Sequence, residues 1–474
     1  MADGLPKLDR ARLRERLLVE FERVVEEVSD AIDEAPAGRV IRDSEEKARD
    51  SLDRFRQIVY EQGLQAKIDA AEAAFPPPTS AATGKPKRHK GRQPYSVLSI
   101  NGRIRLRRVR WHCGQEGSET PIDRLLDEAE STLSEGVREM ACRLNQDASS
   151  FQKAAENLNR TAHVEVSKET LRQLVEGEGK AVLKAMQRAE LMPDWSAEDC
   201  ATSEQTTRVY AGCDGVKVPL VTDEEKKKRR QGIRDKRRRR GRKCKPLPRA
   251  KTGADCAYKD FKVGYLYDES KQHKLVGITS GNHEAAGRML RRMNDQVGLS
   301  KAQERIALVD GAPWIRNQFE FHGLVDAIGL DFYHLQENAQ KARRGVFGEE
   351  SEDGKNWVAE LMHTFKYDGY DAAWDSMTTL RSPLRSPRKR AAANRLMQYV
   401  AERRDMIRYP EFRAKSWQIG SGPTEAECKT TTHRVKGRGR RWDTDNAEAM
   451  MALAALHDSR LWHQRWTNLD PQRN

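Results

Sequence analysis

Three acidic residues, far apart in the sequence, lie in segments where an apolar run gives way to glycine. Asp214 ends the run VYAGCD, Asp310 ends RIALVD, and Glu425 lies in IGSGPTEAECK. An aspartate just past a short β-branched run lies at the end of a strand, and two such strands side by side would bring two carboxylates within reach of one metal ion. A third carboxylate from a following helix would complete the site.

Carboxylate oxygens are hard ligands that suit a pair of Mg²⁺ ions, for which Mn²⁺ can substitute. Such a pair activates a water on one side of a phosphodiester and stabilises the leaving oxygen on the other side. Asp214, Asp310 and Glu425 therefore predict metal-dependent cleavage of a nucleic acid backbone.

The composition of the chain agrees with a polyanionic partner. The 474 residues include 86 Lys and Arg against 72 Asp and Glu, a net charge of +14. A basic surface of this kind attracts nucleic acid. The sequence contains no run of eighteen apolar residues, no signal-peptide core and no C-x-x-C pair among its seven cysteines. We therefore expect a cytoplasmic protein, nucleoid-associated when bound to DNA, without a membrane segment, zinc site or disulfide framework.

We expect residues 1–125 to form helices, a linker and a hairpin. Residues 1–75 have apolar residues at three- and four-residue spacing and predict amphipathic helices. Residues 76–94 combine proline with a basic cluster and predict a basic linker. Residues 95–125 predict a β-hairpin around Asn101 and Gly102. One face of the hairpin is strongly positive, so it is either a solvated strand face or a DNA-contacting ribbon.

Residues 126–195 return to a helical pattern and predict a helix-turn-helix DNA-binding region. The first helix begins near Phe151, and Ser167 caps the second. This order is typical of DNA-binding helix pairs, although capped helix pairs also occur in proteins that do not bind DNA. If the pair binds DNA, the base- or phosphate-facing residues are Lys168, Thr170, Arg172 and Gln173.

Residues 205–336 predict the first part of an α/β catalytic core of RNase H-like fold. A strand carrying Asp214 is followed by strands at FKVGYLYD and KLVGITS, by a helix over residues 283–297, and by a strand that ends in Asp310 beside the first. The basic residues 224–251 repel one another, so they predict a mobile insertion that is either a solvated loop or ordered on a phosphate backbone.

Residues 337–412 predict a helical insertion, and residues 413–474 the C-terminal part of the catalytic core. The aromatic residues of the insertion recur at helical spacing, either as core or as a stacking surface for opened DNA. Pro423 fits the first position of a helix. On that helix Glu425 shares one face with two lysines, whereas Glu427 lies about 200° away. The basic residues expected to contact DNA here are Lys429, Lys436, Arg438, Arg440 and Arg441.

The motifs CDG, VDGAPWI, DFYH, IGSGPTEAECK and VKGRGRRW together resemble those of the DDE transposases of bacterial insertion sequences, the ISKra type, which is related to the Mutator-like group. The resemblance runs from about residue 95 to the C-terminus. It implies a metal-binding triad of Asp214, Asp310 and Glu425 in an RNase H-like domain interrupted by a helical insertion. Asp331 and His334 match the group's C-or-D-x-x-H motif. Cys113 without a partner cysteine and the long basic block depart from the family pattern.

The resemblance implies a transposase that binds the terminal inverted repeats of its element, hydrolyses phosphodiester bonds there and joins the freed 3′-hydroxyls to target DNA. We expect double-stranded DNA as partner and a homo-oligomer, a dimer or larger, on DNA. We expect Asp331 and His334 near the metal site but outside the ligand set, with a satisfied buried pair as the alternative. Two other functions stay open: an RNase H-like nuclease, and a domesticated DNA-binding protein without catalysis.

Overall fold

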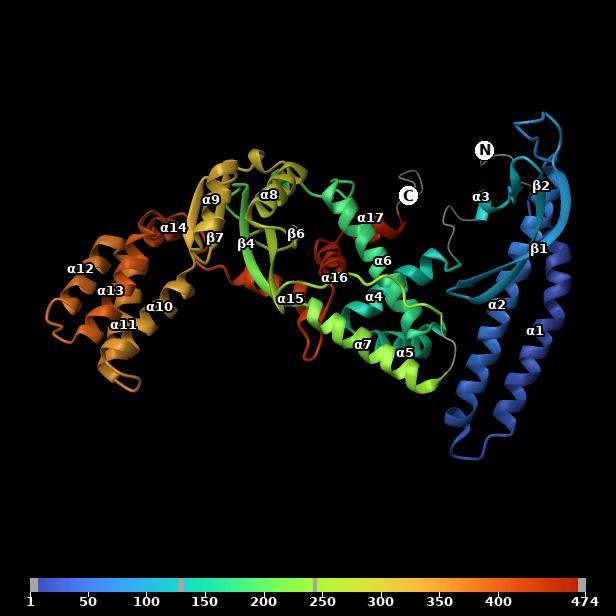
Figure 1. Ribbon diagram of the computed structural model, residues 1–474, viewed down its shortest axis with the longest axis horizontal. Coiled ribbons are helices and arrows are strands. Elements are labelled where there is room, and N and C mark those ends of the chain that lie inside the picture. The colour runs from blue at the N-terminus through green and yellow to red at the C-terminus, as the bar shows by residue number, and fades with distance from the viewer. Residues whose placement is uncertain (1–6, 127–131, 242–244, 468–474) are drawn as a thin grey trace. The chain divides into compact units, whose positions relative to one another are not determined.

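The computed structural model describes residues 7–126, 132–241 and 245–467 (Figure 1). The chain forms two compact units, residues 1–175 and 176–474, each with its own sheet. Among the described residues, no helix has the length and apolar character needed to cross a membrane.

The first unit begins with a hairpin of two helices, α1 (Arg10–Asp33) and α2 (Val40–Ala74). A three-stranded antiparallel sheet follows, β1 (Arg88–Ser99), β2 (Gly102–Cys113) and β3 (Gly117–Glu119), in the order β1-β2-β3. Helix α2 packs against this sheet through a small apolar core. Its buried members are Ile68, Ala71, Val97, Ile104, Leu106 and Ile122.

Side chains of α2 complete the hydrogen bonding of β2. Strand β3 pairs only with the end of β2, from Trp111 to Cys113. Along the rest of that edge, Gln57 donates to the Arg103 carbonyl at 2.7 Å and Glu61 accepts from the Arg105 amide at 2.8 Å. Gln65 bonds both the amide and the carbonyl of Arg107. The helix thus supplies the partners that a neighbouring strand would otherwise provide.

The predicted hairpin is present, but the predicted linker over residues 76–94 is partly wrong. Strand β1 begins at Arg88, where Arg88 pairs with His112. The basic cluster is tied down by acidic partners: Arg92 binds Asp69 and Glu72 of α2, and Lys87 binds Glu116. The proline content and basic cluster predicted a linker, whereas these ion pairs hold the basic residues in place.

Four helices follow the sheet: α3 (Asp123–Leu126), α4 (Glu135–Asp147), α5 (Phe151–Ala162) and α6 (Lys168–Gln187). Helix α5 begins at the predicted residue, and the Ser167 hydroxyl accepts the Thr170 amide at the start of α6, as the capping pattern predicts. Between them His163 is left-handed and Val164 is buried. The structure thus contains the predicted helix pair.

The second unit contains a mixed five-stranded sheet in the order β6-β5-β4-β7-β8. Strand β5 runs antiparallel to β4 and β6, whereas β7 runs parallel to β4 and β8. Thus the strand before Asp310 lies beside the strand that carries Asp214, as predicted. The strands are β4 (Arg208–Pro219), β5 (Tyr258–Asp268), β6 (Lys274–Thr279), β7 (Glu304–Val309) and β8 (Ala327–Leu330).

Glycines in the strands allow helices to pack closely on both faces of this sheet. A Cβ at Gly264 or Gly277 would meet the methionines of α8 (His283–Val297). A Cβ at Gly212 would lie only 1.9 Å from the Thr424 hydroxyl of α15 (Gly422–Lys436). Because residues two apart on a strand point to the same face, Asp214 lies on the α15 side.

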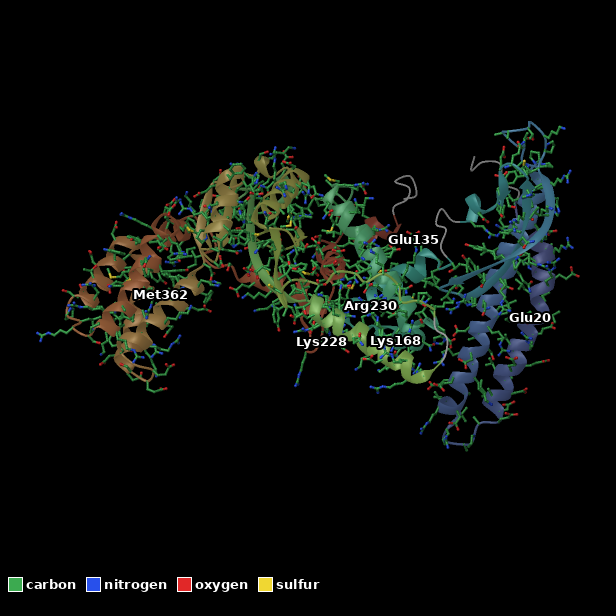
Figure 2. The ribbon with its side chains drawn as sticks, in the orientation of Figure 1. Glu20, Glu135, Lys168, Lys228, Arg230 and Met362 are labelled. Atoms are coloured by element: carbon green, nitrogen blue, oxygen red, sulfur yellow. The ribbon has the colours of Figure 1, made fainter. Side chains whose placement is uncertain are left out.

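The basic block after β4 forms a helix, α7 (Asp223–Arg240), so the predicted mobile loop is wrong there. Thr222 and Glu225 form a capping box, three acids occupy the first turn and four arginines the last. This charge distribution follows the helix dipole, and Lys and Arg are good helix formers. None of its residues is buried. Lys228 and Arg230 are among its basic residues (Figure 2).

The remaining elements of the second unit are helical. Helix α9 (Pro313–His322) follows β7. Between β8 and α15 the elements are α10 (Phe332–Val346), α11 (Glu352–Tyr367), α12 (Tyr370–Arg381), α13 (Pro387–Ala401) and α14 (Tyr409–Ala414), with a 3₁₀ turn at Arg404–Met406. Helices α16 (Thr444–Asp458) and α17 (Trp462–Thr467) follow α15.

Replacing Gly212 with alanine is expected to destabilise the second unit by about 1–3 kcal/mol, because the added methyl has no space between β4 and Thr424. Urea unfolding monitored by circular dichroism would measure the change. The matched control is Gly232→Ala on exposed α7, where nothing lies within 4 Å of the added Cβ, so stability should be unchanged or slightly increased. Equal effects of the two substitutions would contradict the close packing.

Candidate active site

One pocket in the second unit, with a volume of about 650 Å³, is lined by all three predicted metal-binding carboxylates. Asp214, Asp310 and Glu425 share it with His334 and with several lysines. The three acids come from β4, from the residue after β7 and from α15, so strands and a helix on one side of the sheet bring them together. The predicted residues Lys429 and Lys436 line the same pocket.

Asp214 and Asp310 occupy equivalent places on neighbouring strands. The parallel pairing of β4 with β7 ends at Ala211, so Asp214 lies beyond the paired part, although β4 itself continues to Pro219. Asp310 directly follows β7. One carboxylate oxygen of Asp214 accepts the Gly215 amide at 2.6 Å, and one of Asp310 accepts the Ala312 amide at 2.8 Å. These bonds fix the two carboxylates.

The two glutamates at the start of α15 lie on different sides of the helix. Glu425 lines the pocket and is half-exposed. Glu427 is buried and accepts hydrogen bonds from the Thr430 and Thr431 hydroxyls. Burial, together with nearby Asp458, raises the pKa of Glu427. Of the two glutamates, Glu425 therefore shares the pocket with the aspartates, although the oxygens of Asp214, Asp310 and Glu425 do not all lie within 4.8 Å of one another.

The pocket concentrates negative charge. Burial raises the pKa of Asp214, and the neighbouring Asp310 and Glu425 raise it further. Carboxylates that repel one another in this way are stabilised by a cation placed among them. Within the described residues, the second oxygen of Asp214 and of Asp310 has no hydrogen bond. The free oxygen of each aspartate and the Glu425 carboxylate are hard ligands of the kind that Mg²⁺ or Mn²⁺ takes.

Asp331 is a fully buried carboxylate that joins two helices. It caps α10 by accepting the His334 amide at 2.8 Å, and its other oxygen accepts the Ser421 amide at 2.6 Å just before α15. It also bonds the His334 imidazole at 2.8 Å. Because of these bonds, Asp331 holds His334 and the start of the Glu425 helix in place.

His334 lies at the edge of the pocket, with its Nδ1 3.8 Å from Glu425 Oε1. Its hydrogen bond to Asp331 is the main cause that raises its pKa to about 9, and Asp310 and Glu425 add to this. Among the described residues, one group of three possible ligand atoms lies within 4.8 Å of one another, that of Asp331, His334 and Glu425. Both Asp331 oxygens already accept hydrogen bonds, one from His334 and the other from Ser421.

No protein-family model matches the chain, and no curated protein sequence matches it. Among solved structures, the chain is similar to the Drosophila P element transposase strand transfer complex, with 10% identity and a TM-score of 0.28. The similarity covers 72% of this chain and 83% of that chain. A TM-score this low does not establish a shared fold, so this similarity supports no functional assignment for the chain.

Lys262 and Trp314 are among the pocket residues that the sequence pattern did not predict. Lys262 of β5 lies opposite Gly215 and places its ammonium 4.5 Å from the centre of the Trp314 ring. Both residues line the pocket. A lone lysine between the apolar residues of the strand FKVGYLYD was the available signal, because a charged residue rarely occupies a buried strand without a partner.

The helices between β8 and α15 contact the Asp310 turn. Tyr399 of α13 donates a hydrogen bond to the Asp310 carbonyl at 3.4 Å, and Arg403 donates to the Gly311 carbonyl at 3.0 Å. The Arg403 guanidinium also stacks on the Tyr399 ring. Nothing in the sequence pattern marks these residues, since their partners are backbone atoms ninety positions away.

The other predicted DNA-binding residues differ in their surroundings. Arg440 donates to the carbonyls of His433 and Arg434 at the end of α15, and Arg441 pairs with Glu225 of α7. Arg438 is exposed. In the first unit, Lys168 is exposed and Arg172 pairs with Glu169. Arg440 therefore has a structural role in capping α15, whereas Lys429, Lys436 and Arg438 are exposed.

Replacing His334 with alanine is expected to lower the thermal midpoint modestly, because the buried Asp331 carboxylate loses its imidazole partner but keeps its two backbone partners. Metal-dependent DNA cleavage should fall at least about tenfold, since the imidazole lies beside Glu425. The matched control is His283→Ala, an exposed histidine at the start of α8 that should have full activity. Unaltered cleavage by His334→Ala would contradict a role in the reaction.

Proposed function

We propose that this protein is a transposase of the DDE type, which cleaves DNA strands at the ends of its own element and joins the freed 3′-hydroxyls to target DNA. The observation that carries the proposal is the pocket in which Asp214, Asp310 and Glu425 meet lysines that suit phosphates. Carboxylates at the ends of neighbouring parallel strands, completed by an acid from a helix, are suited to metal-dependent phosphodiester chemistry.

We infer an RNase H-like fold for the core. Numbered along the chain, its strands lie in the order 3-2-1-4-5, and the second runs antiparallel to the first. We expect this strand order in an RNase H-like core into which the helices between β8 and α15 are inserted. The helix-turn-helix is the proposed DNA-recognition region, with Lys168 and Arg172 as contacts.

Asp214, Asp310 and Glu425 would hold two Mg²⁺ ions, which when bound activate the attacking hydroxyl and stabilise the leaving oxygen. The residues around them bind and orient the substrate. Lys262, Lys429 and Lys436 provide positive charge for phosphate oxygens. His334 is protonated at neutral pH, because its pKa is raised to about 9, so it can donate a hydrogen bond to a phosphate oxygen.

Substituting Glu425 by glutamine removes one anionic ligand and keeps the side-chain size. The expected result is loss of magnesium-dependent cleavage with normal folding and normal binding of element ends. The assay uses labelled DNA that carries the inverted repeats flanking the gene, with Mg²⁺ and with Mn²⁺. The matched control is Glu427→Gln, two residues away but buried outside the pocket, which should remain active.

An active Glu425→Gln beside an inactive Glu427→Gln would reverse the assignment of the third ligand. The same assay separates the alternative functions. A nuclease would release cut ends without joining them to a second DNA, and a DNA-binding protein without catalysis would bind the repeats and cut nothing. Products in which the 3′ end is joined to target DNA support a transposase.

Helix α7 should contribute affinity that does not depend on DNA sequence, because its many exposed lysines and arginines have no means of reading bases. Replacing six of them with glutamine should reduce the slope of log affinity against log salt by about 0.9 for each phosphate that the helix no longer neutralises. The reduction should be equal for element ends and for random DNA. A weaker affinity for element ends alone would show that α7 reads sequence.

A further inference from the structure

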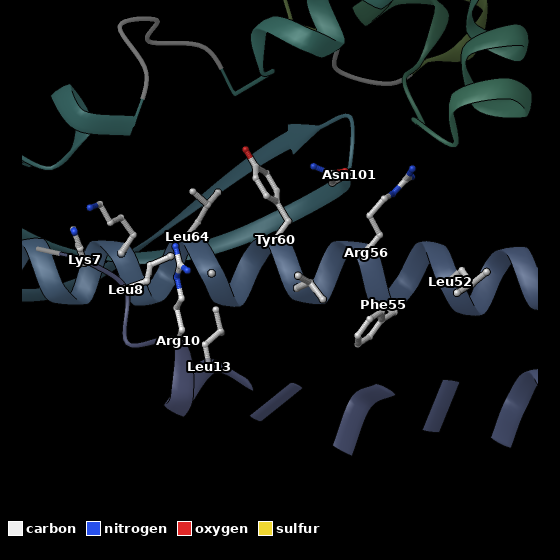
Figure 3. A pocket seen from close by; sticks show the side chains of 13 residues that line it. Lys7, Leu8, Arg10, Leu13, Leu52, Phe55, Arg56, Tyr60, Leu64 and Asn101 are labelled. Atoms are coloured by element: carbon white, nitrogen blue, oxygen red, sulfur yellow. The ribbon is translucent and has the colours of Figure 1, made fainter. Parts of the chain in front are cut away.

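A groove of about 1330 Å³ lies on the first unit, between the start of α1, one face of α2 and the tip of the β1–β2 hairpin (Figure 3). Its α2 side is formed by residues at three- and four-residue spacing, from Leu52 to Lys67. Leu8 and Leu13 border it at the start of α1, and Asn101 borders it at the hairpin tip. Because α2 rises about 22 Å between Leu52 and Lys67, the groove has the length of a helix of about 15 residues.

The floor of the groove is apolar, and the chain leaves it partly open to solvent. Leu52 is 56% exposed and Tyr60 is 39% exposed. Phe55, Val59 and Leu64, on the same face of α2, are half-buried. Large apolar side chains gathered in a partly exposed groove mark an interaction surface, and their helical spacing suits the apolar face of a second helix.

The rim of the groove is positively charged. Of the described residues that line it, the charged ones are all basic: Lys7, Arg10, Arg56 and Lys67. Arg56 is paired with Asp53, 3.1 Å away, whereas Arg10 has no ion pair within the described residues. Glu15 lies about 140° from Arg10 around α1 and does not line the groove.

The start of α1 adds to this positive charge. Its first turn contains no acidic residue, and the helix dipole places further positive charge at the same end. The side chains and the dipole therefore have the same sign beside Leu8 and Leu13. An occupant with negative charge at this end and apolar side chains along the floor would complement both features.

We propose that this groove binds an acidic amphipathic helix of another protein, with its apolar face on the floor and its carboxylates along the basic rim. A second copy of this chain is disfavoured, because a two-fold arrangement would bring the two basic rims together. Duplex DNA would neutralise the rim but would leave the apolar floor uncovered. The inference does not rest on the proposed function.

The probe is a fluorescent helical peptide of about 15 residues, the length of the groove, with leucines at three- and four-residue spacing and glutamates beside them. Its binding to the full chain, without DNA or metal, is measured by fluorescence anisotropy. The acidic peptide should bind at least about tenfold more tightly than the same peptide with lysines in place of the glutamates. Equal affinities, or no binding of the acidic peptide, would overturn the proposal.

Substitutions in the floor test whether the peptide binds in the groove. The double variant Leu52→Glu/Tyr60→Glu should bind the acidic peptide at least about tenfold more weakly, because it places carboxylates on the apolar floor. The matched control is Val19→Glu on α1: Val19 is 68% exposed but does not line the groove, so its affinity should equal that of the wild type. Circular dichroism would verify equal helix content. Equal affinities of the double variant and the control would place the peptide elsewhere and contradict the proposal.

Substitutions in the rim test the charge complementarity. Lys7→Gln/Arg10→Gln should weaken binding of the acidic peptide and leave binding of a peptide with glutamines in place of glutamates unchanged. The control Arg12→Gln/Arg16→Gln removes the same charge from exposed residues that do not line the groove, so it should have a smaller effect. Equal effects of the two double variants would leave only the net charge of the chain and refute a specific rim.

Two competitors test the other occupants. Displacement of the acidic peptide by duplex DNA or by vesicles of an anionic lipid would identify a polyanion- or membrane-binding surface and overturn the proposal. Since peptide binding is measured without DNA or metal, its absence would leave the proposed DNA cleavage unaffected. Conversely, an active Glu425→Gln would leave the groove unaffected.

Discussion

The geometry of the pocket depends on one buried carboxylate, Asp331. It receives hydrogen bonds from the start of α10 and from the residue before α15, so a single side chain ties β8, His334 and the Glu425 helix together. Hydrogen bonding to His334 and Ser421 lowers the pKa of Asp331 against the opposing effect of burial. Such a fully satisfied buried charge stabilises one arrangement of its partners over others.

The packing around Asp331 brings carboxylates of like charge close together. Close packing at Gly212 brings α15 against β4, and the same approach brings Glu425 toward two aspartates that repel it. The lysines of the pocket and the protonated His334 offset part of that repulsion. The carboxylate repulsion thus lies in the pocket where the proposed metal ions and phosphates would bind, as is common in sites built for charged ligands.

The sequence pattern predicted helices and strands correctly where residues close together in the sequence determine them. Helix α8 spans the predicted residues 283–297, α15 begins at Gly422, one residue before the predicted Pro423, and β7 lies beside β4 as the order of elements requires. It failed where partners are distant in sequence. The linker prediction did not include the acids of α2 that bind Arg92. The loop prediction for α7 rested on repulsion between like charges and did not include the capping residues. Lys262, Tyr399 and Arg403 contact residues that are distant in sequence, and such contacts leave no periodic pattern of residue types.

The side chains of α2 along β2 have a consequence for the behaviour of the chain in concentrated solution. An open strand edge is a template on which other strands can add, and the outer edge of β2 would be one over Arg103–Arg107. Gln57, Glu61 and Gln65 occupy its hydrogen-bonding groups at every second residue. The helix therefore blocks the addition of other strands along this edge, and replacing its three polar residues with alanine would open the edge to pairing with another chain.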